Sequence, residues 1–190
     1  MDKIENVKET SANTYAAFLR GINNIGNKTV KMVELKNMFE AIGFNNVRSV
    51  LASGNIIFET NISDTYTVVK KIEGQLAKKL GYEVKVVVRT ADELQSLIKS
   101  NPFGEIKLTP RTKLFLTFLS DTPKSSIKIP HKSADNDFII LRMTGNEIYS
   151  VVRLLPGIRP YRIISFLEKE FGKNITNRSW ETILKTANTI

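Results

Sequence analysis

The sequence predicts an α+β protein of two subdomains, the first ferredoxin-like (βαββαβ) with an antiparallel sheet. Two connections, Ser53-Gly54-Asn55 and Thr144-Gly145-Asn146, each join two apolar extended runs and therefore predict hairpins. Stretches with helical spacing end at Gly43 and Gly81, which are typical helix stops. A composition of 42% hydrophobic and 25% charged residues is that of a globular protein.

The elements of the first subdomain follow from the spacing of apolar residues. The apolar run at 15–20 predicts the first strand. The spacing predicts helices over 31–42 and 64–80, and β-branched and aromatic residues predict strands at 47–52, 56–59 and 84–89. The resulting order, strand-helix-strand-strand-helix-strand, is the split βαβ arrangement. Thr90 and Glu93 then have the spacing of a capping box that opens a third helix.

A subdomain boundary is predicted after Asn101-Pro102-Phe103-Gly104, which ends the third helix. Residues 1–13 show no periodicity and are expected to form a flexible or loosely helical tail, 14–105 the ferredoxin-like subdomain, and 106–190 a shorter α+β unit of related character. The second unit is expected to contain a strand at 114–119, a polar stretch at 120–136 with a short helix, a hairpin from 138–143 and 147–152, and helices over 161–171 and from Ser179. No repeat is visible residue by residue.

Composition excludes several kinds of chemistry. The chain of 190 residues has no cysteine, which excludes disulfides, thiolate catalysis and zinc-finger-type sites. The single histidine, His131, is interpreted as a solvated loop residue, so no metal site is predicted; any cofactor is unknown. The first fourteen residues lack an apolar core, and no apolar run approaches the roughly 20 residues that cross a bilayer. A cytoplasmic protein with no membrane partner is therefore expected.

The loop after the first strand concentrates the most distinctive residues. Four residues separate Gly21 from Gly26, as in a P-loop, but Asn27 lies between Gly26 and Lys28, so the lysine is displaced from its P-loop position. The antiparallel hairpins also do not supply the parallel sheet of P-loop proteins. Two interpretations of the loop stay open. In one, the loop amides together with Arg20 and Lys28 hold a phosphate or carboxylate. In the other, the loop is a structural connection whose glycines adopt positive φ.

Charge is unevenly distributed along the chain. Of the net charge of +9, residues 1–105 contribute +2 (14 Lys and Arg against 12 Asp and Glu) and residues 106–190 contribute +7 (14 against 7). The basic half can attract nucleic acid or other anions, and its candidate phosphate contacts are Arg142, Arg153, Arg159, Arg162 and Arg178. The aromatic consensus of single-stranded RNA binders is missing, so such binding would be unspecific.

Several short motifs together resemble a family. They are Phe18-Leu19-Arg20-Gly21-Ile22-Asn23, Lys31-Met32, Leu35, Gly43-Phe44, Val47-Arg48, Ser53-Gly54-Asn55, Phe58, Val88-Arg89-Thr90, Asn101-Pro102-Phe103 and Arg178-x-Trp180. The set is similar to a bacterial family of uncharacterised proteins, domain of unknown function 1697. The resemblance implies an α+β protein of two ferredoxin-like subdomains and no established activity. A glycine-containing Ser-Lys motif of the family is replaced here by Pro156-Gly157-Ile158-Arg159-Pro160-Tyr161-Arg162.

The functional hypothesis is that the protein binds a small anionic ligand, such as a phosphorylated one, in a loop-lined cleft. The candidate ligand-binding residues are Arg20, Asn23, Lys28, Ser53, Asn55 and Arg178. The alternative is a nucleic-acid-associated protein that uses the basic C-terminal half. An enzyme is a third option, although no residue set defines a reaction and no catalytic residue is assigned. The sequence leaves open whether Arg20, Ser53 and Arg178 share one cleft.

Overall fold

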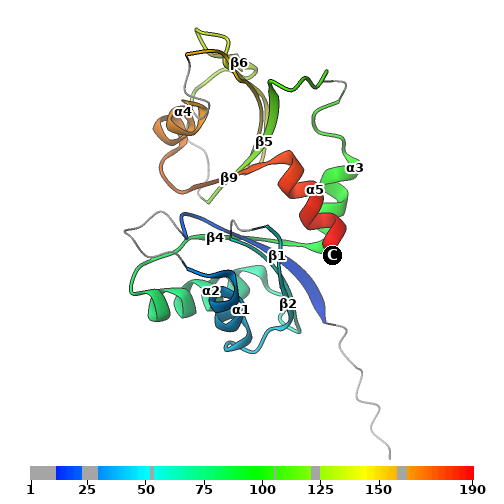
Figure 1. The fold of residues 1–190 in the computed structure, drawn as a ribbon, viewed down its shortest axis with the longest axis vertical. Helices are drawn as coiled ribbons and strands as arrows, with labels where there is room; N and C mark the ends of the chain where they lie inside the picture. The colour runs from blue at the N-terminus through cyan, green and yellow to red at the C-terminus, as the bar shows by residue number, and fades with distance from the viewer. Residues whose placement is uncertain (1–11, 23–29, 52–53, 105, 121–124, 158–161) are drawn as a thin grey trace, which may run out of the picture.

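The computed structural model describes residues 12–22, 30–51, 54–104, 106–120, 125–157 and 162–190, which form two antiparallel sheets and the helices around them (Figure 1). The first sheet has the strand order β2-β3-β1-β4, and the second has the order β6-β7-β8-β5-β9. The mixed α+β class and the ferredoxin-like order predicted for the first half are confirmed. None of the described helices is both long and apolar enough to cross a membrane.

The first half contains four strands and three helices. Their bounds are β1 (Asn13–Leu19), α1 (Met32–Glu40), β2 (Asn45–Ser49), β3 (Asn55–Thr60), α2 (Thr65–Leu80), β4 (Val86–Thr90) and α3 (Ala91–Lys99). Local capping fixes the helix ends: Asp64 accepts a hydrogen bond from the Thr67 amide (2.9 Å), and Gly81 ends α2 at a φ of 79°. The predicted capping box of α3 is present, with Thr90 and Glu93 bonding each other's amides.

The second half repeats this topology, but in its described residues no helix corresponds to α1. Its elements are β5 (Thr112–Leu119), β6 (His131–Lys132), β7 (Phe138–Thr144), β8 (Glu147–Arg153), α4 (Arg162–Phe171), β9 (Ile175–Ser179) and α5 (Trp180–Thr189). In the first sheet β1 lies between β3 and β4, and in the second sheet β5 lies in the same way between β8 and β9. The pairing register also matches: Phe18 lies opposite Asn55 and Val87, and Phe118 lies opposite Glu147 and Thr176.

Three sequence-based expectations for the second half are corrected. Strand β9 was not predicted, because only Ile175 and Thr176 of its five residues are buried and the rest are polar or basic. The short helix expected within 120–136 is absent from the described part of that stretch, where β6 is found instead. His131 is not a solvated loop residue, because its ring stacks on Phe166 at a centroid distance of 4.8 Å.

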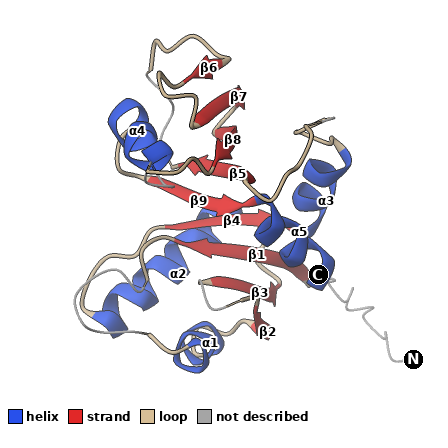
Figure 2. Cartoon of the chain, turned by 45° about the horizontal axis from the view of Figure 1, so that its top comes forward, coloured by secondary structure: helices blue, strands red, loops and turns tan. Residues whose placement is uncertain are grey.

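Three apolar clusters hold the layers together. One lies between the first sheet and α1 and α2, and another lies between the second sheet and α4. The middle cluster joins the two sheets and the helices α3 and α5, which lie side by side in the angle between the sheets (Figure 2). At its centre the rings of Phe18 and Phe118, on the two central strands, stack at 5.3 Å. The division into subdomains at 105/106 stays a prediction, because the middle cluster draws on both halves.

We expect Phe118→Ala to lower the free energy of unfolding by about 3–5 kcal/mol, because it leaves a cavity in the cluster that both sheets share. Both halves should then unfold at a lower denaturant concentration in one transition, which circular dichroism would measure. Tyr66→Ala is the matched control, since Tyr66 is 69% exposed and its loss should change stability by about 0.5 kcal/mol or less. A second half that melts alone while the first is unaffected would contradict a shared core.

Candidate functional site

Two arginines at corresponding positions connect the two halves. Arg178 lies at the end of β9, one residue before the N-cap of α5, and Arg89 lies at the end of β4, one residue before the N-cap of α3. Arg178 donates from Nε to Asn55 Oδ1 and from Nη2 to the Leu19 carbonyl oxygen, both at 2.6 Å. Arg89 donates from Nε and Nη2 to Glu147 Oε1, at 3.3 and 3.2 Å. Each arginine therefore links the last strand of one half to the other half.

The acceptors of these arginines also correspond. Asn55 is the first residue of β3 and Glu147 is the first residue of β8. The guanidinium carbon of Arg178 lies 6.0 Å from the centroid of Phe18, and that of Arg89 lies 4.8 Å from the centroid of Phe118. The junction thus contains one arrangement twice, with a neutral amide as acceptor in one copy and a carboxylate in the other.

Burial governs the electrostatics of both copies. It lowers the pKa of Arg178 to about 10, so the guanidinium stays charged at neutral pH. Asn55 is fully buried and is held by its Nδ2, which donates to the Val50 carbonyl oxygen at 3.0 Å. In the other copy, the Tyr149 hydroxyl donates to Glu147 Oε2 at 2.6 Å; burial first, and then Glu147, raises the pKa of Tyr149.

Gly54, in the middle of the Ser53-Gly54-Asn55 motif, packs against the end of β1, so two of the sequence motifs meet. Gly54 has a φ of +70°, and its carbonyl oxygen accepts from the Leu19 amide at 2.9 Å. A Cβ at Gly54 would lie only 3.1 Å from Ile22 Cγ2 and 3.3 Å from Leu19 Cβ. Glycine is therefore required here by both conformation and space.

Three of the predicted ligand-binding residues lie at this junction. Asn55 and Arg178 bond each other, and Arg178 also bonds the carbonyl of Leu19, the residue before Arg20. Arg20 itself forms an ion pair across the junction with Glu168 of α4 at 3.0 Å, and both side chains are partly exposed. Asn23, Lys28 and Ser53 lie outside the described residues. Their part in a site stays a prediction.

A cleft lies next to this junction, on the open edge of β4. It has a volume of about 410 Å³ and lies between α2 and β4 of the first half and residues Ser120, Asn146 and Asn174 of the second. Its charged lining consists of Lys70, Lys85 and Arg89 against Glu73, so it is net positive. We call this hollow the β4 cleft. Arg20 adjoins it, because the Arg20 amide donates to the Lys85 carbonyl oxygen at 2.8 Å.

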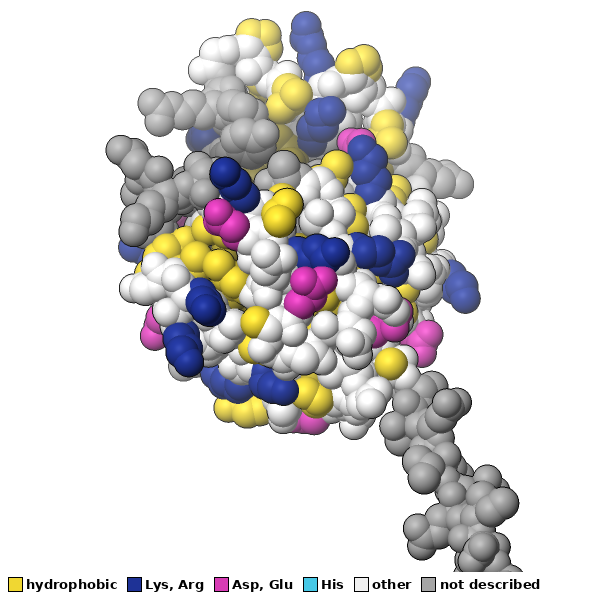
Figure 3. Space-filling model, turned by 60° about the horizontal axis from the view of Figure 1, so that its bottom comes forward, with side chains coloured by type: hydrophobic (Ala, Val, Ile, Leu, Met, Phe, Trp, Pro, Cys, Tyr) yellow, Lys and Arg dark blue, Asp and Glu magenta, His cyan; other side chains and the backbone are white. Residues whose placement is uncertain are grey.

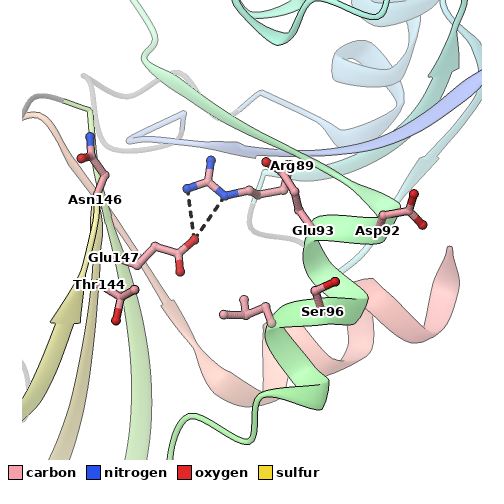
Figure 4. Close-up of a pocket in the computed structure, with 8 residues that line it drawn as sticks. Arg89, Asp92, Glu93, Ser96, Thr144, Asn146 and Glu147 are labelled. Carbon is pink, nitrogen blue, oxygen red and sulfur yellow. Dashed lines mark hydrogen bonds and ion pairs between the residues drawn. The ribbon is translucent and has the colours of Figure 1, made fainter.

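A second hollow of about 740 Å³ lies on the other side of Arg89, between α3 and the β7–β8 turn (Figure 4). Asp92, Glu93 and Glu147 line it with Arg89, so it is net negative, and the Arg89–Glu147 pair lies where the two hollows meet. Within the described chain, no three His, Asp or Glu side chains form a group suited to a metal ion.

The sequence hypothesis did not include Lys70, Lys85 or Arg89 as site residues. Lys70 and Lys85 carry no local signal, because fifteen positions and a helix end separate them and only the fold brings them together. Arg89 has two signals: it lies in the family motif Val88-Arg89-Thr90, and, like Arg178, it is followed directly by a helix N-cap.

We expect Arg178→Leu to lower the free energy of unfolding by at least about 2 kcal/mol, because Asn55 Oδ1 and the Leu19 carbonyl would lose a charged donor in a buried place. Chemical denaturation would measure it. Arg178→Lys should recover only part of the loss, since one ammonium group does not reproduce the two-acceptor geometry of a guanidinium. Arg48→Ala, on the exposed edge strand β2, is the control. An Arg178→Leu protein as stable as that control would show that the hydrogen bonds of Arg178 to the other half contribute little to stability.

Comparison with known proteins places the chain in a family. The conserved bacterial protein SP0830 from Streptococcus pneumoniae has a solved structure that superposes with a TM-score of 0.68; the two are 20% identical, and the alignment covers 94% of this chain and 98% of that one. This likeness concerns the fold. No curated protein matches the sequence. The profile of the family described as "Protein of unknown function (DUF1697)" matches residues 12–149. The resemblance read from the short motifs is thereby confirmed, and the chain belongs to the DUF1697 family.

Proposed function

We propose that the protein binds a small anionic ligand, such as a phosphorylated metabolite, in the β4 cleft. The observation that carries the proposal is the net positive lining of a hollow that lies between the two halves next to the Arg20 loop. Its volume of about 410 Å³ lies within the usual range of small-molecule sites. An anion that enters between the halves would add charge-assisted hydrogen bonds to side chains from both.

The cations of the cleft remain accessible to a ligand. Lys70 and Lys85 are 55% and 40% exposed, and each has a carboxylate at 3.6 Å, Glu73 and Glu83 respectively. The Lys85–Glu83 pair is exposed and contributes little to stability, so a ligand phosphate can replace Glu83 at low cost, whereas Glu73 is only 17% exposed and stays part of the cleft wall. Arg89 is held by Glu147 and so defines the inner wall of the cleft.

The open edge of β4 also directs backbone amides toward the cleft, one of which is bonded to Glu73. The Lys85 carbonyl points toward β1, where it accepts from Arg20, whereas the Val86 amide points outward and donates to Glu73 Oε1 at 3.3 Å. Because the direction alternates along a strand, the Val88 amide points to the same outer side as that of Val86. Asn23, Lys28 and Ser53 are proposed to complete the site from the loops beside Arg20.

The proposal is tested by calorimetric titration of the full chain with inorganic phosphate, pyrophosphate and ribose 5-phosphate. For whichever of these binds, Lys70→Ala/Lys85→Ala should weaken the affinity at least about tenfold, which corresponds to the loss of one charge-assisted hydrogen bond. Lys78→Ala/Lys79→Ala, on the exposed end of α2, removes the same charge and should leave the affinity within about twofold. An equal loss of affinity in both double variants would mean that the effect comes from net charge alone, and it would overturn the proposed site.

Arg20→Ala separates the loop from the cleft. If the loop contributes, Arg20→Ala should weaken the affinity for the same ligand several-fold. The Lys78→Ala/Lys79→Ala control should leave that affinity within about twofold. Unchanged affinity in Arg20→Ala, for every ligand that binds, would mean that the Arg20 loop is not part of the site.

The alternative is a nucleic-acid-associated protein, and the charge of +7 on residues 106–190 favours it. Of the candidate arginines, Arg142 lies over the Tyr149 ring, Arg162 pairs with Asp135, and Arg178 is partly buried and bonded at the junction. On the face shown in Figure 3, Lys and Arg side chains are scattered among acidic and apolar ones. No described residue set defines a reaction, so an enzyme stays a third option without an assigned mechanism.

If the alternative holds, affinity for a single-stranded oligonucleotide should fall steeply with salt. A protein that contacts six to ten phosphates loses about 10³- to 10⁵-fold between about 50 and 200 mM salt. Fluorescence anisotropy over that range would measure the slope. Absent binding at the lowest salt would exclude this alternative and leave the small-ligand proposal unaffected.

A further inference from the structure

A groove on the second sheet combines an apolar floor with a basic rim. It has a volume of about 440 Å³, and its aliphatic lining consists of Ile106, Ile139, Leu141, Val151, Leu154 and Leu155. Three cations, Lys107, Arg111 and Arg153, complete the lining together with two threonines. The groove shares no residue with the β4 cleft. We call it the β7 groove.

The fold explains why this apolar surface is left accessible. Helix α5 packs on β5, β9 and α3 and also reaches β3 of the first sheet, where Ile183 and Ala187 belong to the same buried cluster as Ile57. The corresponding helix of the other half, α3, packs mainly on β1, β4 and α5. Residues 106–112 then pass over β7 and β8, where the Leu154 amide donates to the Arg111 carbonyl oxygen at 2.8 Å. Ile139 and Val151, which are register partners, form the floor beneath.

The charges of the groove all have one sign. Lys107, Arg111 and Arg153 are exposed, and none of them is in an ion pair with a described residue. Every charged side chain in the described lining is a cation. Arg111 and Arg153 both line the groove, and Arg153 lies opposite Thr112, the residue that follows Arg111. A ligand that satisfies both parts of the lining needs an aliphatic tail and an anionic head.

We propose that the β7 groove binds a small amphipathic acid, with its tail on Ile139, Leu141 and Val151 and its head group between Arg111 and Arg153. Tail burial supplies a non-directional gain that grows with chain length, and the arginines fix the orientation through hydrogen bonds to the head group. The same arrangement accepts a fatty carboxylate or an alkyl phosphate, because the two share the chemistry that the groove recognises.

Binding of octanoate, decanoate, decyl phosphate and decanol to the full chain tests the proposal, with calorimetry as the readout. Affinity should rise from octanoate to decanoate, by up to about fourfold for each added methylene. Decanol has the tail without the charge and should bind at least about tenfold more weakly than decanoate. If decanoate and decyl phosphate bind unequally, the stronger one identifies the head group; if neither binds, the proposal is overturned.

Two variants and one matched control locate the site. Arg111→Gln/Arg153→Gln should weaken decanoate at least about tenfold and leave decanol unchanged, whereas Lys78→Gln/Lys79→Gln should change neither. Ile139→Trp fills the floor and should abolish both, with the unfolding midpoint measured to confirm that the protein is folded. Decanoate binding that survives both groove variants would overturn the proposal.

A second copy of the chain is the competing occupant of an apolar groove. Sedimentation equilibrium, with and without decanoate, distinguishes the two. A monomer that binds decanoate supports the proposal; a dimer that Ile139→Trp dissociates, and that does not bind decanoate, overturns it. The β4 cleft provides an internal comparison, since Lys70→Ala/Lys85→Ala should leave decanoate affinity unchanged.

Discussion

The contact between Phe18 and Phe118 is the interaction on which the rest of the structure depends. Each ring lies on the central strand of its sheet, so their stacking at 5.3 Å brings the two sheets together at the middle of the apolar cluster they share. An arginine from the opposite half lies near each ring, and its polar groups are satisfied by the neighbouring strand ends. The clefts on both sides of Arg89 exist because the sheets meet at this point and diverge from it.

Elements with a local signal were predicted from the sequence, and those that depend on distant partners were not. The helix from Asp64 to Gly81 and the Thr90–Glu93 capping box are encoded within a few residues, so their ends were predicted closely. Strand β9 has no apolar alternation of its own and forms because β5 offers it an edge. The related character of the two halves was expected from the order of their predicted elements, but their pairing register was not, since it is not expressed in shared residues.

The residues of the candidate site also fall into those with a local sequence signal and those without one. Arg20, Asn55 and Arg178 were found through the family motifs, and the structure brings them to one junction, where hydrogen bonds and an ion pair hold the halves together. Lys70 lies on α2, an ordinary amphipathic helix, and Lys85 directly precedes the edge strand β4. Their approach depends on the packing of α2 on β4, which no residue spacing expresses.

The chemical difference between the Arg178–Asn55 and Arg89–Glu147 contacts affects how two copies of the chain could associate. If two copies of the first half were to join as the two halves do, Arg89 of each copy would face the amide of Asn55 and would lose the carboxylate of Glu147. Two copies of the second half would place Arg178 against Glu147, but would lack the Asn55 side chain and the Leu19 carbonyl on which it is seated. The unequal acceptors therefore favour pairing of a first half with a second half, and they disfavour pairing of two identical halves from different molecules.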